Sequence, residues 1–325
     1  MLGKEILYLS KKDVQAAGLG FKEIVSTVKD VFEEKYHERV EMPPKPGIHP
    51  IEDAFIHAMP AYIPKIDAAG IKWIAGYPQN PSKNLPYISG LIILNDPSTG
   101  LPVCIMDASW VTAKRTGAVT VLSAKYLARE NPEVIGIVGC GVQGKSHLEA
   151  LCSEFNSIKN VKAFDVSKEK LEQYVEYAKR NFNVEIIKAA GPREVVEDSD
   201  IIVTATPISK KPNPVAKLSW VKRGALMCPI EFDSYWDSDT FRKPDRLYTD
   251  DLKQFEYYKT IGHFQSVERV DGELCELVAG VKKGRKNENE RITAVNLGLA
   301  LVDLAVSKAV YDKALKNKIG VALPY

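Results

Sequence analysis

The residues with the clearest chemical purpose form a glycine-rich turn, Gly139-Cys140-Gly141-Val142-Gln143-Gly144. An apolar strand-like run, Val134 to Val138, precedes the turn, and a helical segment, Lys145 to Glu154, follows it. In this context the first glycine permits a tight turn, the second lets the backbone approach a pyrophosphate, and the third allows close packing of helix on strand. Amides at the helix N-terminus then face the negative phosphates. The turn predicts a dinucleotide site made by Gly139, Gly141, Val142, Gln143 and Gly144; the alternative is an ordinary strand-to-helix turn.

An acidic residue, Asp165, ends the second strand-like run, Val161 to Phe164, 26 positions after Gly139 (165 − 139). A carboxylate at this place accepts the ribose hydroxyls and repels a 2′-phosphate, so it favours NAD(H) over NADP(H). The alternative is that Asp165 caps the next helix, Ser167 to Arg180. A later segment, Thr204-Ala205-Thr206, is expected at the carboxyl edge of the sheet, facing the cofactor, unless its hydroxyls only form a turn.

Alternating strands and helices must position these groups. From Val134 onward the strand-like runs 134–138, 161–164, 184–187 and 201–204 are separated by helical segments. This alternation is typical of a parallel sheet covered by helices. The sequence therefore predicts an α/β fold with a Rossmann-type, doubly wound parallel sheet.

The N-terminal part of the chain has a different pattern. A strand at 6–9 and an amphipathic helix at 21–35 come before a proline-rich extended loop at 42–46, and strands follow at 54–59, 70–75, 89–94 and 101–106. A helix capped by Asp107 or Ser109 is expected to run to about residue 128. A final apolar helix, predicted at 294–315, is expected to pack against this first region. These elements predict a second, α+β domain.

Composition excludes several classes of protein. The 325 residues include 44 Lys and Arg against 42 Asp and Glu, and a net charge of +2 gives no electrostatic reason to expect nucleic acid or an anionic membrane as partner. No apolar run approaches the roughly 18 residues of a membrane helix. The five scattered cysteines indicate a reducing, cytoplasmic location, and the five histidines show no metal-ligand spacing, so no metal is expected.

Several short motifs together resemble the ornithine cyclodeaminase/mu-crystallin family, which includes ornithine and lysine cyclodeaminases, archaeal-type alanine dehydrogenases and cyclic ketimine reductases. The resemblance covers nearly the whole chain, in order and spacing. Besides the glycine-rich turn, its carriers are Ala58-Met59-Pro60-Ala61-Tyr62, Gly70-Ile71-Lys72, Thr99-Gly100-Leu101-Pro102, Lys114-Arg115-Thr116-Gly117-Ala118 and Gly298-Leu299-Ala300.

The resemblance implies a homodimer and a divided first domain. Residues 1–118 and 303–325 would bind substrate and form the dimer, and residues 119–302 would be the inserted NAD-binding Rossmann domain. By position, Lys72 and Arg115 resemble the family's Lys and Arg in the substrate pocket, Asp233 resembles its catalytic Asp, and Thr116 falls among its cofactor-binding residues.

The chemistry of these side chains is consistent with an amino-acid substrate. The guanidinium of Arg115 matches a carboxylate with two charge-assisted hydrogen bonds. Lys72 lies in an apolar run, where burial and a neighbouring Arg lower the pKa of an ammonium, so it could bind the carboxylate or move protons. Asp233 could hold an ammonium or activate water.

This chain departs from the cyclodeaminase pattern at several pocket positions. Lys45 replaces an Arg, His57 replaces a Glu, and Tyr87 replaces a small hydroxyl residue, which weakens the clamp expected for ornithine. Around Asp233 the usual glycine-rich segment is absent, so Glu231 is an alternative acid. All are retained as substrate-site candidates.

Three functions follow from the resemblance. We expect NAD(H)-dependent oxidoreduction of a small α-amino or α-imino acid through an α-imine, as in an amino acid dehydrogenase or a ketimine reductase. One alternative is ornithine cyclodeaminase, which forms proline and ammonia with NAD used catalytically. The other is an NAD(P)H-dependent ligand-binding protein of the mu-crystallin type.

Overall fold

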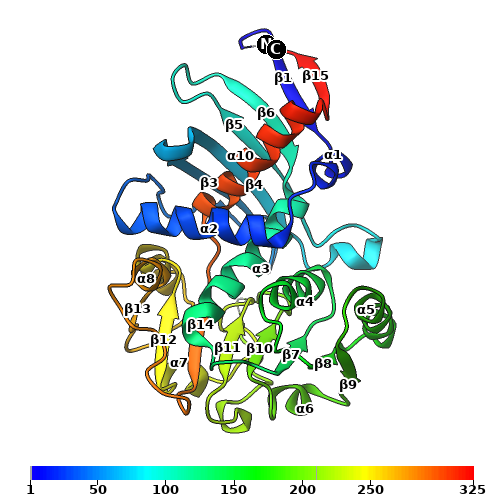
Figure 1. Ribbon diagram of the computed structural model, residues 1–325, viewed down its shortest axis with the longest axis vertical. Helices are drawn as coiled ribbons and strands as arrows, with labels where there is room; N and C mark the ends of the chain where they lie inside the picture. Colours follow the sequence, from blue (N-terminus) through cyan, green and yellow to red (C-terminus); the bar gives the residue numbers. More distant parts are fainter. Residues whose placement is uncertain (1, 210) are drawn as a thin grey trace. The chain divides into compact units, whose positions relative to one another are not determined.

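The computed structural model describes residues 2–209 and 211–325, and the chain divides into two compact units. Unit 1 comprises Met1–Arg115 and Gly298–Tyr325, and unit 2 comprises Thr116–Leu297. Figure 1 shows their elements. Helix α3 (Ala108–Leu127) begins in unit 1 and ends in unit 2. The substrate-binding and cofactor-binding roles expected for the two parts of the chain stay predictions.

Unit 1 contains one mixed sheet of seven strands in the order β15-β1-β6-β5-β4-β3-β2. Only the β1–β6 pair is parallel among these neighbours. The sheet is therefore mixed. Its strands are β1 (Glu5–Leu9), β2 (Gly47–Ile48), β3 (Phe55–Ile63), β4 (Ala68–Gly76), β5 (Ile88–Asn95), β6 (Pro102–Asp107) and β15 (Val321–Pro324).

Helix α10 (Ala300–Asn317) covers one face of this sheet and packs on β3, β4, β5 and helix α2 (Phe21–Tyr36). Along β4 the side chains alternate between the two faces, so Lys72 and Ile74 are buried while Trp73 is exposed. A short helix, α1 (Lys11–Ala16), is closed at its start by a capping box between Ser10 and Asp13. The helix-covered face therefore holds the core of unit 1.

Unit 2 contains an eight-stranded sheet in the order β13-β12-β14-β11-β10-β7-β8-β9, and all its pairs are parallel. The chain enters at β7 in the middle, moves outward through β8 and β9, and then crosses to β10 and β11 on the other side. This reversal is the doubly wound order of a Rossmann fold. Its strands are β7 (Val134–Val138), β8 (Asn160–Phe164), β9 (Glu185–Lys188), β10 (Ile201–Thr204), β11 (Leu226–Pro229), β12 (Arg246–Thr249), β13 (Gly272–Glu273) and β14 (Ile292–Val295).

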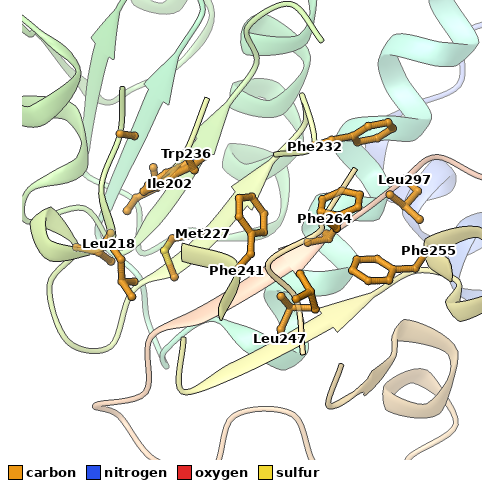
Figure 2. Packing of buried hydrophobic residues seen from close by; sticks show 14 of the residues in the cluster. Ile202, Leu218, Met227, Phe232, Trp236, Phe241, Leu247, Phe255, Phe264 and Leu297 are labelled. Carbon is orange, nitrogen blue, oxygen red and sulfur yellow. The ribbon is translucent and has the colours of Figure 1, made fainter. Parts of the chain in front are cut away.

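A cluster of large apolar side chains fills the part of unit 2 around β10, β11 and β12 (Figure 2). Phe264 stacks on Phe255 and lies edge-on to Phe241 within it. This aromatic packing fixes the loops that follow β11 and β12. The helices of unit 2, besides the end of α3, are α4 (Val142–Glu154), α5 (Lys168–Asn181), α6 (Pro192–Val196), α7 (Asp239–Arg242), α8 (Leu252–Thr260) and α9 (Leu274–Val278).

The C-terminal helix begins later than the sequence predicted. The prediction of helix from residue 294 is wrong for its first residues, because β14 ends at Val295 and α10 starts at Ala300. Gly298 has a φ of +81° between them, a left-handed conformation that favours glycine and separates strand from helix. The expectation that this helix packs on the first region is confirmed by its contacts with β3, β4 and β5. Within the described residues, no helix has the length and apolarity required to cross a membrane.

Candidate active site

A buried cluster of three charged side chains occupies the helix-covered face of the unit 1 sheet. The Asp303 carboxylate pairs through Oδ2 with Lys72 Nζ at 2.5 Å and through Oδ1 with Arg115 Nε at 2.9 Å. The side chains of Lys72 and Asp303 are 1% and 0% exposed, and that of Arg115 is 9% exposed. Buried charges are retained when they are paired, so one carboxylate accounts for the burial of two cations.

Three elements place this cluster. Lys72 is the central residue of β4, paired with Met59 and Ile92 on the neighbouring strands. Arg115 lies in helix α3, and Asp303 lies in the first turn of α10, where the helix dipole favours a negative charge. Burial lowers the pKa of Lys72 from its usual 10.5 to about 7, and the positive charge of Arg115 adds to this effect while Asp303 opposes it.

The predicted pocket residues Lys45 and His57 lie in the same unit. Lys45 is buried, and its Nζ donates to the backbone oxygen of Gly298 at 3.2 Å. The His57 ring stacks on Phe55, with 4.3 Å between the ring centroids. Burial, with Lys45 nearby, lowers the pKa of His57 to about 3, so this imidazole is neutral at physiological pH. Tyr87, just before β5, accepts a backbone hydrogen bond from Tyr77.

The glycine-rich turn of unit 2 joins β7 to α4. Gly139 has a φ of +94°, and its amide donates to the oxygen of Phe164 on β8. A Cβ added at Gly139 would lie 2.5 Å from Ala205 O, and one at Gly144 would lie 2.2 Å from Gly139 O, so both positions exclude a side chain. A Cβ at Gly141 would meet nothing within 4 Å. The turn therefore presents open backbone at the N-terminus of α4, which fits a pyrophosphate.

Asp165 lies directly beside this turn. Its Oδ2 accepts a hydrogen bond from Cys140 N at 2.8 Å, and its Oδ1 accepts one from Ser167 N at 2.8 Å. The helix that follows is capped by the Ser167 side chain, which accepts from Lys170 N. Asp165 thus faces the turn and does not cap α5 with its own side chain. Each carboxylate oxygen has a second lone pair with which to accept a ribose hydroxyl.

The carboxyl end of β10 is fixed by a buried carboxyl group. Glu231 is fully buried and accepts hydrogen bonds from Thr204 Oγ1 at 2.6 Å and from Thr206 N at 3.3 Å. The indole of Trp236 donates to Thr204 Oγ1 at 2.9 Å. Burial raises the pKa of Glu231 from 4.5 to about 7. The Thr204 hydroxyl is thus engaged inside the protein, while Ala205 backs the glycine-rich turn.

Asp233 has a partner that the sequence did not indicate. Its Oδ1 lies 2.8 Å from His263 Nδ1, and its Oδ2 accepts from Phe264 N at 2.6 Å. The preceding residue, Phe232, has a φ of +64°, which is strained for a residue other than glycine. Its ring packs edge-on against Tyr258 and His263. Aromatic packing therefore supports the strained turn that carries Asp233.

The structure gathers the predicted residues into two groups. Lys45, His57, Lys72, Tyr87 and Arg115 are in unit 1, while Thr116 and the remaining candidates are in unit 2. Sequence reasoning missed Asp303 and His263. A signal existed for Asp303, because it is the only acid in the apolar run from Leu299 to Val306. Among residues 2–209 and 211–325, no three His, Cys, Asp or Glu side chains are grouped to hold a metal ion.

These features define an α/β protein with a Rossmann unit suited to a dinucleotide and a second unit that carries a buried, net positive cluster. The chain belongs to the ornithine cyclodeaminase/mu-crystallin family, whose sequence model matches residues 6–318. It is similar to the nodulation efficiency protein NfeD of Rhizobium meliloti, with 35% identity over 98% of this chain and 99% of that protein.

Two solved structures of the same fold are also similar. One is the Delta(1)-pyrroline-2-carboxylate reductase of Thermococcus litoralis in complex with NADH and L-proline, with 31% identity, a TM-score of 0.88, and coverage of 98% of this chain and 100% of that chain. The other is an archaeal alanine dehydrogenase dimer with bound NAD, with 33% identity, a TM-score of 0.85, and coverage of 98% and 99%. The predictions of the family, of the α/β fold class and of an enzyme are confirmed. The cofactor predicted for this chain is the one that both neighbours hold.

Proposed function

We propose that this protein is an NAD(H)-dependent oxidoreductase that interconverts a small α-amino acid and its α-imino acid, with a cyclic imino acid as the preferred substrate. The observation that carries the proposal is the pairing of Lys72 and Arg115 on the single carboxylate of Asp303. Two cations and one anion leave a net positive charge in a site shielded from water. A substrate carboxylate neutralises that charge.

The two cations have different roles in the proposed reaction. Arg115 binds the substrate carboxylate through its Nη groups, since its Nε is used by Asp303. Lys72, with a pKa near 7, holds and releases a proton at neutral pH and delivers it to the imine nitrogen. In the reductive direction the nitrogen gains this proton and the α-carbon gains a hydride; in the oxidative direction both leave. Lys45, His57 and Tyr87 are proposed to line the rest of the pocket.

The cofactor is proposed to bind in unit 2, and NAD(H) supplies the hydride acceptor or donor when it is bound. The open backbone at Gly141 and the α4 amides fit its pyrophosphate, and Asp165 fits the adenosine ribose. Val142, Gln143, Thr116 and the Thr204-Ala205-Thr206 segment are the remaining proposed contacts. The relatives named above support this choice, because both structures contain NAD or NADH.

The charges in unit 1 favour a substrate with one amino group. The groups that influence the pKa of Lys72 are one acid, Asp303, and two cations, Arg115 and Lys45. Where a cyclodeaminase has a Glu, His57 is neutral. A second ammonium, as in ornithine, would be repelled by these cations, so we place the cyclodeaminase reaction second.

Asp233, rather than Glu231, is the acid that we propose contacts the substrate or its attacking water. Glu231 is fully buried and engaged with Thr204 and Thr206, which suits a role in positioning the β10 end. Asp233 is 15% exposed and is held by His263 and the Phe264 amide. A partly exposed, oriented carboxylate is the better acid-base group.

One set of assays tests the function. The protein is incubated with Δ1-pyrroline-2-carboxylate and NADH, with pyruvate, ammonia and NADH, and with ornithine and substoichiometric NAD. We expect NADH oxidation at least with the cyclic imine. Proline and ammonia formed from ornithine without net NADH would support the cyclodeaminase instead. Tight NADH binding without turnover in any assay would support a ligand-binding protein, and tighter binding of NADPH would contradict the role of Asp165.

The exposed face of the unit 1 sheet supports a further part of the proposal, a homodimer. Trp73 and Leu91 are cross-strand neighbours on that face and are 47% and 43% exposed. Adjacent exposed apolar side chains mark interaction surfaces, and the archaeal alanine dehydrogenase neighbour is a dimer. We propose that a second copy covers this face. Light scattering should give twice the monomer mass for the wild type and a lower mass for Trp73→Glu.

We also propose a cytoplasmic location. All five cysteines are unbridged, which suits a reducing compartment. Fractionation of expressing cells should recover the protein with cytoplasmic markers; recovery with secreted or membrane fractions would contradict the proposal.

A further inference from the structure

We propose that Asp303 is a positioning residue of the reaction: it orients the Arg115 guanidinium toward the substrate carboxylate and keeps a proton available on Lys72. The inference rests on the proposed function, because it concerns the same pocket. Asp303 was not among the residues that the sequence pointed to, and it contacts the substrate only through its two partners in this scheme.

The geometry shows how one carboxylate can act on both cations. The two oxygens of Asp303 are divided between them, with Oδ2 on Lys72 Nζ and Oδ1 on Arg115 Nε. Bonding at Nε fixes the plane of the guanidinium and leaves Nη1 and Nη2 as the atoms directed at a ligand. Rotation of either cation out of the site would leave one oxygen of the buried Asp303 carboxylate without its partner.

Gly298 leaves room for the guanidinium of Arg115. A Cβ built on Gly298 would lie 2.8 Å from Arg115 Nη1 and 3.0 Å from Nη2. The Nη groups of Arg115 therefore lie beside Gly298, on the side where any other residue would carry its side chain. The Asp303 carboxylate holds Arg115 at Nε, and the Nη groups occupy space that a side chain at residue 298 would fill, so we infer that the orientation of Arg115 is set before any substrate binds.

The charge balance explains why the carboxylate is needed. Lys72 and Arg115 are like charges in a site with little water, and the charge of Arg115 disfavours protonated Lys72. Asp303 offsets part of this repulsion, because its charge and hydrogen bond both favour protonated Lys72. Without Asp303, Lys72 would lose its proton at a lower pH. The charged or titratable groups that face Lys72 are Asp303 from α10, Arg115 from α3, Lys45 from the segment before β2, and His57 from β3.

A purely structural role for Asp303 makes different predictions. Such a role would lower stability in Asp303→Asn but leave the titration of Lys72 and the substrate KM unchanged. Positioning predicts changes in both. Asp312→Asn is the matched control, because Asp312 lies on the same helix, 53% exposed and paired with Lys308, away from the cluster.

The experiment measures Lys72 directly and then measures turnover. The Lys72 side chain is titrated by NMR in protein that carries ¹³Cε-labelled lysine, and its signal is identified from its loss in Lys72→Met. We expect Asp303→Asn to lower the midpoint by about one pH unit and to reduce kcat/KM for the cyclic imine by about 100-fold. Asp312→Asn should match the wild type in both measurements.

A second pair of variants keeps the test decisive if Asp303→Asn does not fold. Asp303→Glu retains the charge but moves it by one methylene, so we expect a wild-type Lys72 midpoint with a raised substrate KM. Gly298→Ala should raise KM, because its methyl group displaces the Nη groups of Arg115. An unchanged KM in both variants, or an unchanged Lys72 midpoint in folded Asp303→Asn, overturns the inference.

The titration separates this inference from the proposed function. It needs no substrate, so a lowered Lys72 midpoint in Asp303→Asn together with an inactive wild type would contradict the oxidoreductase and leave the control of Lys72 by Asp303 intact. Turnover by the wild type, with the same Lys72 midpoint in the wild type and in Asp303→Asn, would support the oxidoreductase and contradict the control of Lys72 by Asp303.

Discussion

In the proposed function, the charged cluster of unit 1 and the glycine-rich turn of unit 2 both bind anionic groups, but they differ in how they are made. The cluster uses two side-chain cations held by Asp303 in a buried site. The turn uses backbone amides and the absence of side chains at Gly139, Gly141 and Gly144. Anion binding by the cluster depends on protonation and charge pairing. Anion binding by the turn depends on the space that its glycines leave open.

The difference teaches where specificity can change. A charged cluster is sensitive to every neighbouring charge, so we expect Lys45 and His57, as proposed pocket residues, to alter which substrates it accepts. A backbone turn is insensitive to such changes, since its donors carry no net charge. We therefore expect relatives to differ more in substrate than in the way they bind the pyrophosphate.

The largest expected effect comes from removing a cation of the cluster. Lys72→Met and Arg115→Gln should each reduce kcat/KM by about 1,000-fold, because a positioned proton donor or a carboxylate ligand is lost. NADH affinity, measured by fluorescence titration, should remain that of the wild type. A parallel loss of NADH binding would show that the two regions are not separable as we describe them.

The second prediction compares two buried carboxyl groups. Asp303 is paired with cations, whereas Glu231 accepts hydrogen bonds from a hydroxyl and an amide. Burial raises the pKa of Glu231 to about 7, so between pH 4.5 and 7 the folded state binds a proton that the unfolded state releases. The free energy of unfolding should therefore fall as pH rises through this window, by about 3 kcal/mol at most. Urea titrations should show this slope in the wild type and a smaller one in Glu231→Gln.

The third prediction separates the glycines of the turn. At Gly141 a Cβ meets no protein atom, so Gly141→Ala should leave the melting temperature nearly unchanged but weaken NADH binding about tenfold, since the methyl group enters the cofactor space. At Gly144 a Cβ would meet Gly139 O, so Gly144→Ala should destabilise the fold by about 1–3 kcal/mol. Calorimetry with and without NADH measures both. Equal changes in melting temperature and in NADH affinity for the two variants would contradict the proposal that the cofactor needs the space left open at Gly141.

The smallest expected effect concerns His263. His263→Asn removes the imidazole beside Asp233 while the Phe264 amide still holds that carboxylate, so we expect kcat to fall about fivefold with little change in KM. Stopped-flow and steady-state kinetics across pH 5–9 provide the measurement. An unchanged kcat would make His263 a packing residue only.

The parts of the fold that depend on local pattern were predictable. The strands at 134–138 and 201–204 have the bounds expected, because each is an apolar run closed by turn residues. The final helix was predicted too long because Ala294 and Val295 extend an apolar pattern that a strand and a helix share. The β15 strand was missed, because its pairing with β1 joins the two ends of the chain.

The candidate site was predictable only where one residue type implies one chemistry. Glycines at fixed spacing indicate a phosphate turn on their own, but Asp303 and His263 gain their roles from partners far along the chain. Asp303 lies 188 positions from Arg115, and no local pattern reports such a pairing. An isolated acid in an apolar helix was the available sign, and the fold was needed to supply its partners.

Phe232 connects packing to chemistry in a way that constrains how the protein can evolve. A left-handed conformation costs a residue of this kind about 1–3 kcal/mol, and the rings of Tyr258, His263 and Phe264 hold it there. Mutations that loosen this aromatic cluster would let the backbone relax and carry Asp233 away before the protein unfolds. If Asp233 acts as we propose, we therefore expect substitutions in this part of the core to reduce turnover before they prevent folding.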